Sequence, residues 1–210
     1  MREDRRLISV TGQGEASLAP DLAVVSFAVT SMDRELAPTR DDVSARSSAV
    51  LATLRELGIA DADLNAPDVG IQPEHDYRKG QRLIGYRVTR QMTAKVRDLD
   101  TLGAVLDGLV GAGANEVHGT QMTAADPSAA EHRALEAAVA AARAKAEVLA
   151  AAAGVTLGPV ARIEEEGAGG IPMPRFRAMG AMAESADVPT EVAAGDLTVT
   201  RRIRAWFGIG

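Results

Sequence analysis

The 210-residue sequence contains no cysteine and only three histidines, His75, His118 and His132. Without cysteine the chain forms no disulfide, iron–sulfur cluster or thiol nucleophile, and three histidines make a multi-histidine metal centre improbable. Aromatic residues make up 3% of the chain, so the core has to be built from Val, Leu, Ile, Ala and Met. No stretch approaches the roughly 18 apolar residues of a membrane-spanning helix. These absences leave an ordinary globular protein with an aliphatic core.

The charge balance also narrows the function. The chain carries 29 acidic and 23 basic residues, a net charge of −6, which argues against a general nucleic-acid binder. The charged residues at the start predict a tail at residues 1–6, and the length predicts a single domain over residues 7–210. The charged tail leads straight into Leu7 without the apolar stretch of a secretory leader, which predicts a cytoplasmic protein. A periplasmic or secreted protein whose leader had been removed is the alternative.

Alternation of apolar and polar residues predicts the strands. The clearest case runs from Ile84 to Val96, where one face is apolar and the other polar. The segment from Leu197 to Phe207 repeats this pattern, and Leu22 to Thr30 is apolar on both faces, as in a central strand. Shorter candidates are Leu7–Thr11, Val69–Gln72, Glu116–Met122 and Val160–Glu164.

Apolar residues at spacings of three and four predict three helices. The first carries the stripe Val43, Ser47, Val50, Leu54 and Leu57, with Thr39 and Asp42 resembling a capping box and Gly58 ending the helix. The second spans about Leu99–Val110. The third begins at the cap Asp126-Pro127 and ends at Gly154. Its predicted inward stripe is Leu135, Val139, Ala142, Ala146 and Leu149.

This order of elements predicts an α+β fold, a two-layer sandwich of a mainly antiparallel sheet with three helices on one face. The strand at Ile84–Val96 is long, so the helices leave part of its apolar face uncovered. An uncovered apolar face is a reason to oligomerise. A long loop at residues 165–195, rich in Gly, Pro, Ala and Met, interrupts the pattern. It is interpreted either as disordered or as an arm that docks on a neighbouring subunit.

Three ordered motifs resemble the SIMPL-domain family. The first is Ile8-Ser9-Val10-Thr11-Gly12-Gln13-Gly14-Glu15 with Pro20-Asp21 after it. The second runs from Ala141-Ala142-Arg143-Ala144-Lys145-Ala146-Glu147 through Gly154 and Leu157-Gly158-Pro159-Val160 to Ile163-Glu164, and the third is Gly195-Asp196-Leu197-Thr198-Val199. Together they anchor nearly the whole chain.

The resemblance implies an α+β domain that tends to assemble into ring- or channel-like oligomers, with a loose association with stress responses. Many bacterial members are periplasmic or outer-surface immunogenic proteins. The resemblance supplies no catalytic residues. Bacterial members carry a leader peptide that is missing here, which argues against a periplasmic location.

Short motifs that could carry chemistry have simpler explanations. A dinucleotide-binding loop needs a third glycine and a helix directly after it, so Gly12-Gln13-Gly14 is interpreted as a turn between strands. Glu74-His75-Asp76 is the densest set of metal-ligand types, but neighbours on an extended segment point in alternating directions, which favours a solvated hairpin loop.

Residues of catalytic type are equally isolated. His118 and Glu116 share a strand face but lack a nucleophile nearby, so a surface ion pair is the default. His132 is expected on an exposed helix face. Ser47 and Ser48 lie in mid-helix, and no Gly-x-Ser-x-Gly elbow occurs. The sequence therefore predicts a protein that is not an enzyme, with no metal or cofactor.

Two arginines depart from the strand pattern. Arg90 and Arg201 each occupy an apolar position of a long strand, where a buried charge would need a partner. One interpretation places them at strand ends that meet water. The other places both at a subunit interface, paired with acids such as Glu164, Glu165 or Glu166. Met173, Phe176 and Met179 in the loop are further interface candidates because thioethers and rings form adaptable docking surfaces.

The residues favour a non-enzymatic, homo-oligomeric scaffold, and the family resemblance implies a channel-like assembly linked to stress responses. The alternative is a binding module for a small ligand or a protein partner that uses the loop at residues 165–195.

Overall fold

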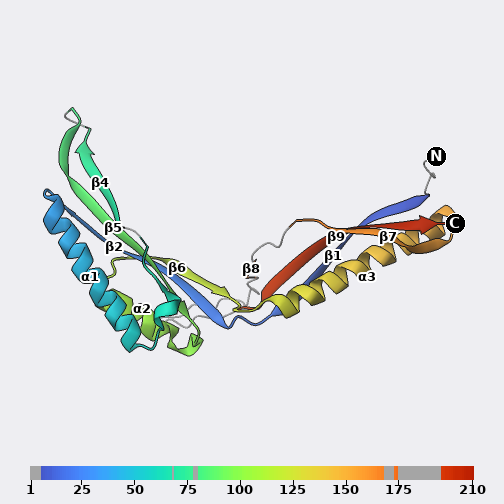
Figure 1. Cartoon of the computed structure of the whole chain (residues 1–210), viewed down its shortest axis with the longest axis horizontal. Helices are drawn as coiled ribbons and strands as arrows, with labels where there is room; N and C mark the ends of the chain where they lie inside the picture. Colours follow the sequence, from blue (N-terminus) through green and yellow to red (C-terminus); the bar gives the residue numbers. More distant parts are fainter. Residues whose placement is uncertain (1–5, 68, 78–79, 168–172, 175–194) are drawn as a thin grey trace, which may run out of the picture. The chain divides into compact units, whose positions relative to one another are not determined.

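The computed structural model describes residues 6–67, 69–77, 80–167, 173–174 and 195–210. The chain divides into two compact units (Figure 1). Unit 1 takes its described residues from both ends of the chain, 6–20 together with 124–167, 173–174 and 195–210, whereas unit 2 is formed by described residues between 21 and 123. Unit 2 is therefore inserted into the sequence of unit 1.

Unit 2 is an antiparallel sheet with two helices. The sheet has the order β3 (Leu64–Asn65), β5 (Arg82–Val96), β2 (Leu22–Asp33), β6 (Glu116–Thr123), and β4 (Val69–Asp76) also pairs with β5. The helices are α1 (Leu36–Glu56) and α2 (Leu102–Gly111), and short 3₁₀ turns lie at Asp61–Asp63 and Leu99–Thr101.

The core of unit 2 lies between α1, α2 and the inner face of β2 and β5. Phe27, Leu54 and Met92 are among its largest fully buried side chains. On α1 the buried positions are Thr39, Val43, Ser47, Val50 and Leu54. The apolar spacing read from the sequence therefore identifies the inward face of this helix.

Unit 1 is a second antiparallel sheet with one long helix. The sheet has the order β1 (Leu7–Leu18), β9 (Leu197–Ile209), β7 (Leu157–Glu165), and β8 (Met173–Pro174) pairs with β9. The strand β1 pairs with β9 along its whole length, from Leu7 opposite Gly208 to Leu18 opposite Leu197. The helix α3 (Ser128–Ala153) contacts β1 and β9 (Figure 1).

A stripe of alanines on α3 lies directly against the sheet of unit 1. Its members recur every fourth residue and are Ala130, Ala134, Ala138, Ala142, Ala146 and Ala150. Opposite them, a methyl group added at Gly12 would overlap the carbonyl oxygen of Ala138 and lie 2.8 Å from Ala142 Cβ. One added at Gly14 would overlap the carbonyl oxygen of Ala134. Small side chains on both elements are thus what allows the helix backbone to approach the strand this closely.

The α+β class, the three helices and the antiparallel pairing are confirmed. The strands form two sheets instead of one, because alternation shows which face of a strand is buried and not which strand it pairs with. Pro20, which has no amide donor, separates the ladders of β1 and β2. The single domain over residues 7–210 stays a prediction.

Two local predictions about the helices are wrong. The predicted inward stripe of α3 is correct at Ala142 and Ala146, but the buried face is otherwise made of further alanines, and Val139 and Leu149 are exposed. The proposed capping box at Thr39 and Asp42 lies inside α1, which begins at Leu36, and the Thr39 hydroxyl donates to Glu35 O. The start of α3 differs by one residue from the prediction: Pro127 occupies the N-cap position, and Asp126 before it accepts a hydrogen bond from the Ser128 amide. Most of the loop at residues 165–195 lies outside the described residues.

Replacing Gly12 by alanine is expected to lower the free energy of unfolding by about 3 kcal/mol or more, since the new methyl meets helix backbone that cannot rotate away. Urea unfolding measures the change. Gly103→Ala is the matched control, because a methyl there meets no atom within 4 Å. This control should raise stability by about 0.5–1 kcal/mol, the helix preference for alanine. Equal effects of the two substitutions would contradict the close packing.

Candidate functional site

The Gly12-Gln13-Gly14 motif lies within β1, so its interpretation as a turn is wrong. No helix N-terminus follows it, and the strand continues to Leu18. Its two glycines make room for α3, which explains the motif by packing and leaves no phosphate site there.

Arg201 is buried and has its acidic partners within the same chain. The residue is 7% exposed and lies on the face of β9 that contacts α3. Its Nη2 is 2.5 Å from Glu131 Oε1 on α3, and its Nε is 3.7 Å from Glu165 Oε1 on β7. The strand therefore does not meet water at this position, and the ion pair joins three elements of unit 1. A role for Arg201 between subunits stays a prediction.

Arg90 is only half-buried and poorly paired. It lies on β5 opposite Val29 and Val69, on the face that carries Met92. Its Nη2 donates to Ala66 O at 3.4 Å, and its buried Nε has no hydrogen-bond partner among the described residues. This unsatisfied donor sits beside the uncovered part of the sheet described below, and the interface role of Arg90 stays a prediction.

The acidic residues and histidines that the sequence offered as metal ligands or catalytic groups do not form a common site among the described residues. Glu74-His75-Asp76 ends β4 and is not a loop, and Glu74 is paired with Arg87 at 2.6 Å. The described residues contain no group of three or more potential ligands placed to hold a metal ion. His118 Nε2 lies 3.7 Å from Glu116 Oε2, the expected surface pair.

The remaining candidate residues fall into two groups. His132 is exposed on α3, and the hydroxyl of Ser47 is buried in α1 without a partner among the described residues. Of the loop candidates, Met173 pairs with Thr198 through its backbone in β8. Phe176 and Met179 lie outside the described residues.

The hairpin of β4 and β5 exposes apolar side chains on the face that elsewhere forms the core. Register places Val69 and Ile71 opposite Arg90 and Val88, and Ile84 lies farther along β5, at the irregularity of the ladder between Gly85 and Leu83. These three side chains are 42%, 46% and 44% exposed, whereas Val88 is fully buried. Helix α1 contacts β2 and β5 but does not extend over the hairpin tip (Figure 1). We call Val69, Ile71 and Ile84 the hairpin patch.

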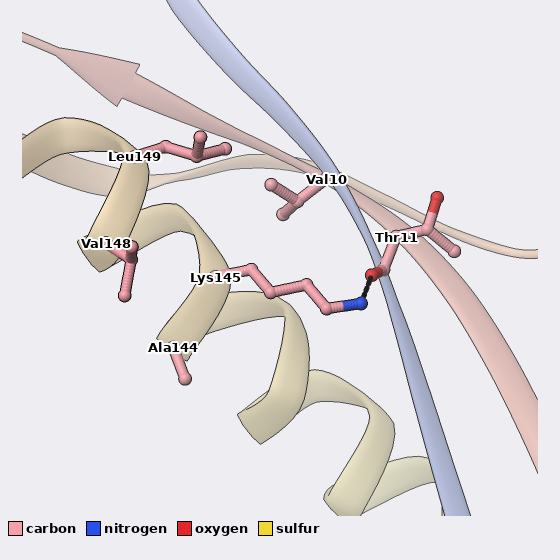
Figure 2. Close-up of a pocket in the computed structure, with 6 residues that line it drawn as sticks. All are labelled: Val10, Thr11, Ala144, Lys145, Val148 and Leu149. Atoms are coloured by element: carbon pink, nitrogen blue, oxygen red, sulfur yellow. Dashed lines mark hydrogen bonds between the residues drawn. The ribbon is translucent and has the colours of Figure 1, made fainter. Parts of the chain in front are cut away.

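A second apolar surface lies on unit 1 beside β1. A depression of about 600 Å³ is lined by Val10, Thr11, Ala144, Lys145, Val148 and Leu149. Figure 2 shows the Lys145 side chain reaching from α3 to the carbonyl oxygen of Thr11, a distance of 2.8 Å. Val148 is 70% exposed. One cation at the rim of an apolar surface is suited to binding and lacks the groups of a catalytic centre.

Hydrogen bonds lower the pKa of two carboxyl groups, Asp63 and Asp126. Asp63 accepts two 2.7 Å hydrogen bonds from the guanidinium of Arg97, and these bonds hold the pKa of Asp63 below its ordinary value. The cap bonds from Ser128 lower the pKa of Asp126 in the same way. In both cases the lower pKa favours the carboxylate that accepts these hydrogen bonds, so the shift reflects a structural contact.

Comparison with known proteins assigns the chain to a family. A family model described as "SIMPL: Protein of unknown function (DUF541)" matches residues 8–207. The chain belongs to the SIMPL family. It is 35% identical to the 26 kDa periplasmic immunogenic protein of Brucella melitensis biotype 1, over 96% of this chain and 84% of that protein. It is also 29% identical to the uncharacterized protein YggE of Escherichia coli K12, over 83% of this chain and 71% of that protein.

The resemblance drawn from the three motifs is therefore confirmed. The sequence did not predict the depression beside β1 of this SIMPL protein, because Leu149 was assigned to the inward stripe of the helix and Val148 was not considered. It also missed Glu131 as the partner of Arg201. The signal for both was available: six alanines at a spacing of four mark the inward face of α3 and place the larger side chains on its flanks.

Glu131→Ala is expected to lower the free energy of unfolding of the SIMPL protein by about 2–3 kcal/mol, because it leaves the buried guanidinium of Arg201 with one distant acid. Chemical denaturation measures the loss. Glu136→Ala on the exposed face of α3 is the control and should change stability by less than about 0.5 kcal/mol. Similar losses in both variants would show that the ion pair does not stabilise unit 1.

The pair of Asp63 and Arg97 predicts a pH dependence. Because the pKa of Asp63 is lowered in the folded state, its stabilisation is present above its unfolded pKa of about 3.9 and is lost as pH falls through the folded value. Asp63→Asn should therefore be less stable than the parent at pH 7, and the difference should shrink below about pH 4. Unfolding curves at several pH values test this. Asp107→Asn, at an exposed position of α2, should show no such convergence.

Proposed function

We propose that this SIMPL protein is a non-enzymatic scaffold that works as a homo-oligomer, with the hairpin patch as a contact between subunits. The exposure of Val69, Ile71 and Ile84 is the observation that carries the proposal. Apolar side chains that project from the core-bearing face of a sheet gain the hydrophobic free energy of burial when a second surface covers them.

The edge geometry of the hairpin favours contact through its face. Pro73 lies within β4 and provides no amide donor, and the ladder between β4 and β5 is irregular between Glu74 and His75. Both features discourage the addition of another strand along β4. An apolar face next to a blunted edge supports packing of one sheet face on another surface.

The chemical content of the described residues agrees with a scaffold. Potential nucleophiles, acids and bases lie apart or in structural pairs, as with Glu74 and Arg87 or Asp63 and Arg97. Arg90, whose buried Nε has no hydrogen-bond partner among the described residues, lies opposite Val69 of the hairpin patch. A channel-like arrangement and a protective role under stress, both implied by the family resemblance, belong to the same proposal.

The periplasm is the compartment we propose for this assembly. Two of the related proteins carry "periplasmic" in their names. No helix in the described part of the chain is long and apolar enough to cross a membrane. The cytoplasmic location expected from the charged residues at the start of the sequence is the competing assignment, and cell fractionation with compartment markers distinguishes the two.

Light scattering coupled to size exclusion tests the assembly. The parent protein should elute with a discrete mass that is a multiple of 21.9 kDa. The double variant Ile71→Glu, Ile84→Glu should shift to a smaller mass while its circular dichroism stays unchanged, because carboxylates cannot be buried without a partner.

Val110→Glu supplies the matched control, since Val110 is 62% exposed on α2 and lies outside the hairpin patch. It should keep the mass of the parent. A parent protein that is a clean monomer would overturn the scaffold, and the hairpin patch would then be the candidate site for another molecule. An oligomer that persists in the double variant would remove the hairpin patch from the interface.

A further inference from the structure

The outer edge of β1 offers unpaired backbone groups. This strand ends the sheet of unit 1, with β9 as its neighbour among the described strands. Arg6 O accepts a bond from the amide of Ile209, so even-numbered residues of β1 face β9 and odd-numbered ones face outward. The amides of Ser9, Thr11 and Gln13 therefore point to the open edge, and no described residue accepts from them.

Two cations from α3 lie along this edge. Lys145 Nζ donates to Thr11 O at 2.8 Å, and Arg133 Nη2 donates to Ser17 O at 3.0 Å. Six residues of strand separate the two carbonyl groups, a distance of about 20 Å. Among the described residues neither cation belongs to an ion pair, and β1 itself contributes one carboxylate, Glu15, so the two cations leave an excess of positive charge along this edge in a chain whose net charge is −6.

Apolar surface adjoins the same edge. The depression described above lies between β1 and the flank of α3, and its walls include Val148 and Leu149 (Figure 2). Val10 at its floor has its side chain on the α3 side of the sheet. An added strand would thus find backbone donors, two cations and an apolar depression on one side of unit 1.

We propose that the β1 edge binds an extended acidic segment of a partner protein by strand addition. The segment's amides and carbonyls would form hydrogen bonds with β1, and its carboxylates would form ion pairs with Lys145 and Arg133. An apolar side chain would fill the depression. A ligand amide would then replace Lys145 on Thr11 O, which frees the ammonium group for a carboxylate.

Charge decides between this partner and a second copy of β1. Pairing two such edges would bring two lysines and two arginines together against only the two Glu15 carboxylates of the paired strands, an excess of positive charge that is repulsive. The simpler interpretation is that both cations only protect the edge from pairing. Protection alone does not explain why Val148 and Leu149 are exposed beside the cations, and the experiment below separates these interpretations.

The probe is a fluorescein-labelled peptide, Val-Thr-Glu-Thr-Ala-Thr-Ala-Thr-Glu-Thr-Val. Its glutamates are six residues apart and face the same side as its valines, and its symmetric sequence fits either strand direction. Fluorescence anisotropy at about 50 mM salt should show saturable binding to the full chain. The double variant Lys145→Gln, Arg133→Gln should weaken binding at least tenfold, whereas Arg143→Gln, whose side chain pairs with Glu147, should not.

Two modified peptides test the strand geometry. In antiparallel addition the residues opposite the outward-facing residues of β1 carry the hydrogen bonds, and in this peptide they are the threonines; in parallel addition the residues between the threonines carry them. Methylating one of these two sets of amides should therefore abolish binding, and methylating the other set should leave it within about threefold. Absence of binding by the parent peptide overturns the proposal in favour of edge protection. Equal binding of both methylated peptides overturns it in favour of attraction between charges alone.

Discussion

Unit 1 depends on the close approach of α3 to β1. Alanines at every fourth position of the helix face Gly12 and Gly14, so the two backbones lie closer than larger side chains would permit. Close packing of small groups gives many weak dispersion contacts and leaves no cavity. The same approach sets where everything else on α3 falls: Glu131 reaches Arg201, and Lys145 and Arg133 reach the edge of β1. A helix held farther away would place none of these side chains correctly.

Much of this fold could be predicted from the sequence, and the failures have a common physical origin. Alternation located every strand of four or more residues, and apolar spacing identified the inward face of α1 correctly. The face of α3 was misassigned because apolar size was taken as the signal, whereas the strand opposite carries glycines and selects for alanine. The division into two sheets was missed because side-chain periodicity contains no information on pairing partners. The surfaces proposed for binding arise from such pairings, so they could not be read from the sequence.

The two arginines at apolar strand positions have opposite environments. Arg201 lies under α3, where water is excluded and Glu131 and Glu165 compensate its charge. Arg90 lies next to the exposed hairpin patch of unit 2. Its guanidinium has one long hydrogen bond, and its buried Nε has no partner among the described residues. The same residue type at the same position in a pattern therefore marks a completed structural contact in one unit and an incomplete one in the other. The difference depends on which helix covers the strand, and only the tertiary structure supplies that.

The order of the strands along the chain has a consequence for synthesis. The described residues of unit 2 are contiguous and have all emerged once Thr123 has been synthesised, but β9, the strand with which both β1 and β7 pair, comes last. At common translation rates the interval is on the order of ten seconds. During that time β1 lacks its partner strand, and the alanine stripe of α3 lacks β9, one of the two strands that it packs against. A ribosome that stalls before Leu197 would therefore present a folded unit 2 attached to an unfolded unit 1, a species that chaperones and proteases recognise by its exposed apolar surface.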